Sequence, residues 1–165
     1  MTAAGPNLPA KTDGELDAII ANHERLGQWS APLLLAAVAE RSRRRDGGLD
    51  LDRTLALILS AAREGRFVTY KDVAAQSGLT WDKVRWRVFD HLGDLCVRER
   101  ARSGTMPSVM VVPEPNREDG TLSGESYAGF ERIHLRLHPS ETLRGEALVA
   151  RERQKLREFA AGAGA

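Results

Sequence analysis

The chain has 165 residues, of which 42% are hydrophobic and 28% charged, the composition of an ordinary globular protein rather than a disordered one. Its 24 basic and 23 acidic residues leave a net charge of +1, which excludes a polycation that coats nucleic acid indiscriminately. The single cysteine, Cys96, excludes an internal disulfide and has no zinc-binding spacing with the four scattered histidines. We therefore expect neither a metal nor any other cofactor.

The apolar segments are too short to cross a membrane. The longest candidate, residues 31–39, falls well below the roughly 20 residues that a bilayer requires. Residues 1–13 also lack the basic and apolar pattern of a signal peptide. We expect a cytoplasmic protein without membrane association.

Two helices are predicted ahead of the central part of the chain. Residues 1–12 indicate a flexible leader, and apolar spacing over residues 13–49 predicts an extension with helices at 13–26 and 32–44. The second helix ends in four arginines of residues 41–45, where cations favour the negative end of the helix dipole. We favour a solvated helix end for these arginines over phosphate binding.

A helix–turn–helix is predicted within the central residues 50–137. Its expected elements are a helix at 51–64 capped by Asp50, an extended segment at 66–70, a helix at 70–76 capped by Thr69, a turn at Gly78, and one helix at 81–98 capped by Thr80.

The 81–98 helix has an apolar side and a side that carries charge. An arginine in the first turns of such a helix can pair with a guanine edge in the major groove, whereas a lysine contacts phosphate. Arg87 is the preferred base contact, with Lys83 beside it. The alternative is that both cations only pair with Asp90 and Asp94, one turn further along.

Trp86 falls on this same polar side. An exposed ring there can stack on a base or pack on a partner protein. Burial beneath the N-terminal helices is the interpretation that we favour.

Two extended segments predict a β-hairpin wing after the helix–turn–helix. Residues 109–112 form an apolar run, residues 133–137 alternate with period two, and a polar loop at 113–129 joins them. The expected fold is α+β, mostly α: a winged helix–turn–helix with N- and C-terminal helical extensions. Residues 138–165 supply the last helix, from about 141 to 159, and a frayed tail at 162–165.

Several segments, in this order, resemble alkylguanine-DNA alkyltransferases and the non-enzymatic alkyltransferase-like proteins. They cover about half of the chain: FVTYKDVA at 67–74, Gly78, VRWRV at 84–88, MPSVMV at 106–111, DGTLSG at 119–124 and YAG at 127–129. Similar domains also occur as parts of bacterial restriction and genome-defence proteins.

The resemblance implies a DNA-binding unit without alkyl transfer. The family's reactive Cys-His-Arg follows a proline, and here Ser108, Val109 and Met110 stand at those positions. A serine between two apolar residues has no neighbouring base to activate it, and Cys96 lies toward the apolar side of its helix. The family's recognition-helix arginine matches Arg85 or Arg87, of which we favour Arg87.

These considerations predict a non-catalytic protein that binds double-stranded DNA, as a transcription regulator, a sensor of modified DNA or a genome-defence component. The expected contact residues are Tyr70, Thr80, Lys83, Arg85, Trp86 and Arg87. A protein-interaction adaptor on a winged-helix scaffold is the main alternative, and hydrolysis through Ser108 is the weakest. A homodimer is compatible with either main hypothesis. We interpret His91, His134 and His138 as structural histidines, with no metal site.

Overall fold

The computed structural model describes residues 6–163, most of which lie in helices. The α-helices of this part are α1 (Asp13–Arg25), α2 (Pro32–Arg45), α3 (Leu51–Arg63), α4 (Tyr70–Gln76), α5 (Trp81–Val84), α6 (Val88–Arg102), α7 (Gly124–Leu137) and α8 (Gly145–Ala163). Short 3-10 turns are η1 (Leu8–Ala10), η2 (Pro107–Met110) and η3 (Glu114–Asn116). Strands β1 (Val68–Thr69) and β2 (Val111–Val112) pair in parallel, with Val68 opposite Val111. The expected α+β, mostly α class is confirmed.

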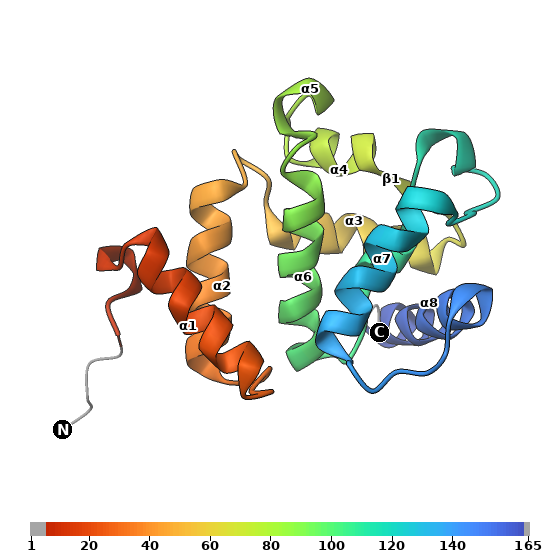
Figure 1. Ribbon diagram of the computed structural model, residues 1–165. Coiled ribbons are helices and arrows are strands. Elements are labelled where there is room, and N and C mark those ends of the chain that lie inside the picture. The colour runs from red at the N-terminus through yellow and green to blue at the C-terminus, as the bar shows by residue number, and fades with distance from the viewer. Residues whose placement is uncertain (1–5, 164–165) are drawn as a thin grey trace.

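Helix α6 runs through the middle of the molecule (Figure 1). The α1–α2 pair lies on one side of it and α7 and α8 lie on the other, while α4 and α5 sit at one end. Most α6 side chains from Val88 to Val97 are buried, which fits this central position. None of the helices in residues 6–163 is at once long and apolar enough to span a membrane.

The helix starts follow the capping chemistry of the sequence. Thr12 and Glu15 form a capping box at α1, and Thr69 and Asp72 form another at α4. The Asp50 side chain accepts a hydrogen bond from the backbone N–H of Arg53 at 2.8 Å, as predicted for the start of α3. The helices expected at 13–26, 32–44, 51–64 and 70–76 are therefore confirmed to within a residue or two.

The single helix expected at 81–98 is wrong. The structure breaks it into α5 and α6 with a turn at residues 85–87, and α6 continues to Arg102. Thr80 occupies the N-cap position of α5, but its side chain makes no capping hydrogen bond, so that part of the prediction fails as well. Both Val84 and Val88 are fully buried on either side of the turn, so the apolar stripe continues across the break.

The β-hairpin wing is also wrong. Residues 133–137 lie in α7, and β2 pairs with β1 instead of with a following strand. Phe130, His134 and Leu137 are buried side chains of α7, and their spacing of four and three residues is helical. Ile133 and Leu137 share one side of α7, whereas Leu135 between them lies on the opposite side and is only partly buried.

The expectations for the two ends of the chain need correction within the described residues. Leu8 is buried, and the Arg44 guanidinium donates hydrogen bonds to the backbone carbonyls of Leu8, Pro9 and Lys11, so residues 6–12 are not a free leader. The last helix is α8, which extends to Ala163 instead of ending near 159. Residues 1–5 of the expected leader and 164–165 of the expected tail lie outside the described residues.

Candidate nucleic-acid interface

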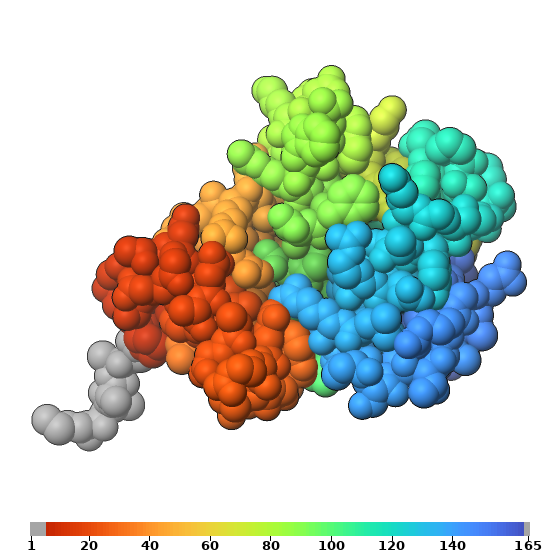
Figure 2. Space-filling view, in the orientation of Figure 1, coloured from red at the N-terminus to blue at the C-terminus, as the bar shows by residue number. Residues whose placement is uncertain are grey.

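The α5–α6 turn, residues 85–87, presents the most exposed aromatic side chain. Trp86 is 80% exposed, so the expected burial under the N-terminal helices is wrong. In the space-filling view, residues of this region project from one end of the molecule (Figure 2). The guanidinium of Arg85 lies 4.8 Å from the centre of the Trp86 ring, a cation–π contact that restrains the two side chains together.

The cations of this region keep their charges unpaired. Lys83, Arg85 and Arg87 are exposed, and none of them forms an ion pair within residues 6–163. The alternative that pairs Lys83 and Arg87 with Asp90 and Asp94 is therefore wrong for this structure. Asp94 is buried and accepts a hydrogen bond from Arg41 at 2.8 Å.

Arg87 takes a different direction from the one that we expected of a base-contacting arginine. A side chain at Gly47 would collide with the Arg87 guanidinium, so this guanidinium lies directly against the backbone of the α2–α3 connection. Gly47 has φ +63°, which favours glycine independently of that contact. The turn therefore leaves Trp86 and Arg85 as its outward pair.

The Tyr70 ring packs against two aromatic rings on either side of the turn. Its ring centre lies 5.1 Å from that of Phe89 and 6.4 Å from that of Trp81, and burial raises the pKa of its hydroxyl. Phe89 is 49% exposed and covers Tyr70 on the solvent side. Sequence reasoning missed Phe89, whose helical spacing from Trp86 loses its meaning because Trp86 lies in the turn before α6. Thr80 is exposed, and its hydroxyl is available to an external partner.

A cleft of about 790 Å³ opens beside the turn, between the α1–α2 pair and the helices α6 and α7. Arg87 and Phe89 belong to both the turn region and the cleft. The other lining residues include the arginines 41, 45, 132 and 136 and the acidic residues 17, 24, 46, 90, 94 and 125. Of these arginines, Arg132 forms no ion pair or side-chain hydrogen bond within the described part of the chain.

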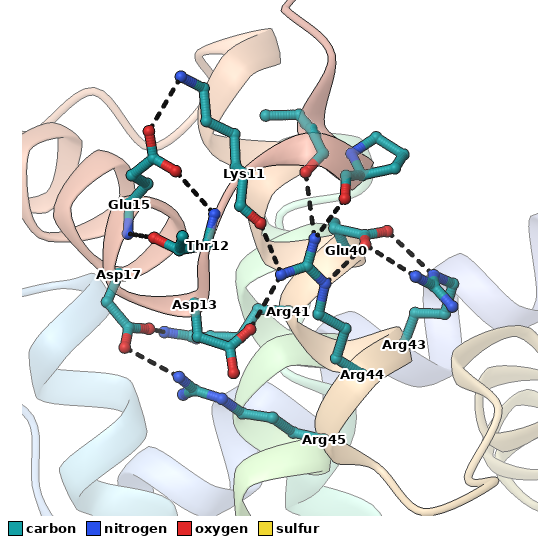
Figure 3. A network of polar contacts seen from close by, with 12 residues as sticks. Lys11, Thr12, Asp13, Glu15, Asp17, Glu40, Arg41, Arg43, Arg44 and Arg45 are labelled. Carbon is teal, nitrogen blue, oxygen red and sulfur yellow. Dashed lines mark hydrogen bonds and ion pairs between the residues drawn. The ribbon is translucent and has the colours of Figure 1, made fainter.

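Each arginine at the end of α2 is paired with a carboxylate of the same chain (Figure 3). The ion pairs are Arg41 with Asp17 and Asp94, Arg43 with Glu40, Arg44 with Glu40 and Asp13, and Arg45 with Asp17. Hydrogen bonds from Arg43 and Arg44 lower the pKa of Glu40 to about 2. Neither a solvated helix end nor a phosphate site describes this cluster, which instead fastens α2 to α1 and α6.

His91 has the structural role that the sequence predicted for it. Its ring is fully buried, with Nδ1 2.5 Å from Asp46 Oδ2 and Nε2 2.8 Å from Thr54 Oγ1. Asp46 also accepts a hydrogen bond from Ser42. This chain of polar groups links α2, α3 and α6 away from solvent.

His134 has carboxylate neighbours that sequence spacing did not reveal. His134, Glu141 and Glu152 offer ligand atoms within 4.8 Å of one another. Arg151 forms ion pairs with both glutamates, and Lys155 lies 3.6 Å from Glu152, so these carboxylates already have cationic partners. The arrangement is that of a charge-balanced brace between α7 and α8.

Ser108, at the position of the family's reactive cysteine, is buried. It accepts a hydrogen bond from Cys96 Sγ at 3.3 Å, and no histidine or lysine side chain hydrogen-bonds to it within residues 6–163. Burial raises the pKa of the Cys96 thiol to about 11, which keeps it protonated near neutral pH. The predicted inertness of Cys96 is consistent with this environment.

Comparison with known proteins finds no relative whose function could be compared with this site. No family model, no curated protein and no solved structure matches the chain. The resemblance to alkyltransferases therefore stays a prediction that depends on the order of the motifs.

Proposed function

We propose that this chain is a non-catalytic DNA-binding protein that resembles the alkyltransferase-like proteins in the order of its motifs but lacks their β-hairpin wing within residues 6–163, and that it meets DNA at the α5–α6 turn. The observation that carries the proposal is the pairing state of the cations there: Lys83, Arg85 and Arg87, which are close to the exposed Trp86 in sequence, form no ion pair within residues 6–163. Free cations release counterions from a polyanion, and this release supplies much of the affinity of proteins for DNA.

Each residue of the turn has a defined part in this proposal. Lys83 and Arg85 neutralise phosphates, and the Thr80 hydroxyl donates to a phosphate oxygen. Arg87 reaches the ligand from the edge of the cleft. Tyr70 does not touch the ligand directly but holds Phe89, and with it the first turn of α6.

Residues 113–123, between β2 and α7, stand where the sequence predicted a wing, but without its β-hairpin. Arg117 donates to both carboxylate oxygens of Asp72, at 2.8 and 3.0 Å, which fixes the segment to α4. Arg117 is already paired with Asp72, and the segment also carries Glu114, Glu118 and Asp119. We therefore expect this segment to repel phosphate. The contact with DNA therefore belongs to the turn, and this segment braces the helix–turn–helix.

The test is a titration of a labelled duplex followed by fluorescence anisotropy at several salt concentrations. Affinity should fall steeply with salt, and alanine at Lys83 or Arg85 should reduce the slope of log affinity against log salt by about one for each phosphate that the variant no longer neutralises. Arg43→Ala is the matched control, because it removes an arginine that is already paired with Glu40. Binding that ignores salt, or that responds equally to Arg43→Ala, overturns the proposal.

The adaptor remains a second candidate, because Trp86 and Phe89 together expose aromatic surface. A protein partner that packs on these rings is expected to bind with little salt dependence and to tolerate Lys83→Ala. The roles of regulator, sensor of modified DNA and genome-defence component all rest on the same binding step. Light scattering at two concentrations tests the homodimer.

A further inference from the structure

Resting on the proposed function, we infer that the α5–α6 turn binds the unpaired bases of a single DNA strand by stacking, in preference to reading the base edges of an intact duplex. Trp86 is the first stacking residue and Phe89 the second. The inference comes from the broken helix, the exposure of the two rings and the cleft beside them.

The broken helix removes the geometry that edge reading requires. A recognition helix lies in the major groove and offers several side chains from its exposed side. Here α5 has four residues, and α6 passes into the interior almost at once, with Val88, His91 and Leu92 buried. The outward surface is therefore a single turn of chain with Trp86 at its apex.

Trp86 is suited to base faces and not to base edges. An indole has one N–H donor and no acceptor, so it cannot recognise the donor and acceptor pattern of a base pair. The Arg85 guanidinium lies over one face of the ring at 4.8 Å, and the other face can stack on any base. In an intact duplex each base face is already covered by its neighbours. An 80% exposed ring thus finds its best nucleic-acid partner where bases are unpaired.

Phe89 is a second exposed ring, and it lines the cleft. It lies three residues after Trp86, is 49% exposed, and is backed by the Tyr70 ring at 5.1 Å. Phe89 and Arg87 both line the cleft, and Arg132 faces it from α7. A strand that stacks on the two rings has these two arginines beside it for its phosphates, and neither forms an ion pair within residues 6–163. Asp90 and Glu125, which line the same cleft and are also unpaired in this part of the chain, keep the phosphates to the side of the arginines.

The experiment compares a labelled oligothymidylate strand with a hairpin duplex of equal length, using the full chain and fluorescence anisotropy at one salt concentration. Wild type should prefer the single strand. Trp86→Ala and Trp86→Leu should each weaken single-strand binding roughly tenfold, while Trp86→Phe, which keeps a ring, should retain most of it. Leu26→Ala is the control, because Leu26 is also an exposed large apolar residue but is the C-cap residue of α1 and lies outside both the turn and the lining of the cleft.

Tryptophan fluorescence gives a second readout. Trp29 is buried and Trp81 is half-buried, so stacking on the exposed Trp86 should dominate the quenching by added strand. Quenching should disappear in Trp86→Phe although that variant still binds. Circular dichroism of each variant verifies that the helices are intact.

The outcomes separate this inference from the proposed function. If the duplex binds at least as tightly as the strand, or if Trp86→Ala binds the strand as wild type does, the stacking inference is overturned while salt-dependent duplex binding still supports the proposed function. Weakened binding in Trp86→Leu with retention in Trp86→Phe supports aromatic stacking, and retention in both overturns it. Absence of binding to either DNA overturns both.

Discussion

Two segments of five residues, 41–45 and 83–87, are both rich in cations but differ in whether these cations are paired with carboxylates. The end of α2 contains four arginines within residues 41–45, and each of them has a carboxylate partner (Figure 3). The α5–α6 region contains Lys83, Arg85 and Arg87 within five residues, and none of them has one in the described part of the chain. The denser cluster is therefore the less available to a polyanion.

The difference teaches that the pairing of cations, and not their number, marks a candidate nucleic-acid surface. An arginine that is already bonded to buried or half-buried carboxylates must give up those bonds before it can hold a phosphate. A free cation gives up only water and counterions. Four predictions test whether this distinction holds, and they run from the largest expected effect to the smallest.

Removal of Arg41 should affect the fold and leave DNA binding unchanged. The Asp94 carboxylate is buried beside it, so Arg41→Ala should lower the free energy of unfolding by about 3 kcal/mol, the usual result of breaking a buried pair from one side. Urea unfolding measures this change. The double variant Arg41→Ala/Asp94→Asn should recover part of it, and a single variant as stable as wild type would contradict the assigned pairing.

The same buried carboxylate should give the fold a characteristic pH dependence. Burial raises the pKa of Asp94 to about 6 and outweighs the attraction of Arg41. The folded chain therefore holds this proton more tightly than the unfolded chain, in which aspartate has a pKa of about 3.9. The resulting stabilisation is complete below about pH 4 and is lost as the pH rises through about 6.

Asp94→Asn isolates this effect from the other carboxylates. The stability of wild type relative to the variant should fall by about 2–3 kcal/mol between about pH 4 and pH 7, as measured by urea unfolding at each pH. A difference that stays constant across this range would show that Asp94 keeps an ordinary pKa.

Removal of a charge at the turn should lower DNA affinity and leave stability nearly unchanged, whereas removal of Arg41 in α2 should lower stability and leave DNA affinity unchanged. Lys83→Ala and Arg85→Ala should each weaken DNA binding by a few-fold, which is about 1 kcal/mol, and change thermal stability little, because both side chains are exposed and unpaired. Anisotropy and thermal melting on the same samples separate the two readouts. A large drop in stability in either variant would mean that the turn is structural.

Arg45→Ala should have the smallest effect. Arg45 and Asp17 are both about half exposed, and a surface pair of this kind contributes about 0–1 kcal/mol. DNA affinity should stay within twofold of wild type, since the arginine is not offered to a ligand. If its removal weakens DNA binding as much as Arg85→Ala does, the contrast between the two regions is wrong.

Local signals in the sequence were sufficient for much of the fold. The capping residues Asp50 and Thr69 located the starts of α3 and α4, because these side chains satisfy backbone N–H groups within their own turn. The mostly helical class follows from these signals together with apolar spacing. They act over three or four residues and need no tertiary context.

The two failed elements differ in what explains them. The helix expected at 81–98 breaks at residues 85–87, and residue burial does not explain this break, because one regular helix would also bury Val84 and Val88 and turn Trp86 outward. Residues 133–137 fit strand and helix patterns equally well, and the burial of Phe130 and His134 decides for the helix.

The candidate site was predictable in its residue types and not in its geometry. Lys83, Arg85 and Trp86 were identified from position alone, and the structure leaves all three exposed. The direction of Arg87 toward Gly47, the exposure of Phe89 and the cleft depend on contacts between segments some 40 residues apart in sequence, which no local pattern encodes.

The seating of His91 against Asp46 limits how the chain can be divided for laboratory work. Residues 50–137 look like a self-contained unit in the sequence, yet this histidine draws its hydrogen bond from the preceding helix pair, and Arg63 donates to the backbone of Ala160 in α8. A fragment cut at those boundaries would leave the buried His91 without its Asp46 acceptor and would expose the side of α3 that packs against α8. Expression of residues 6–163 keeps both contacts, together with the hydrogen bonds from Arg44 to the backbone of residues 8–11 and the Thr12 cap of α1.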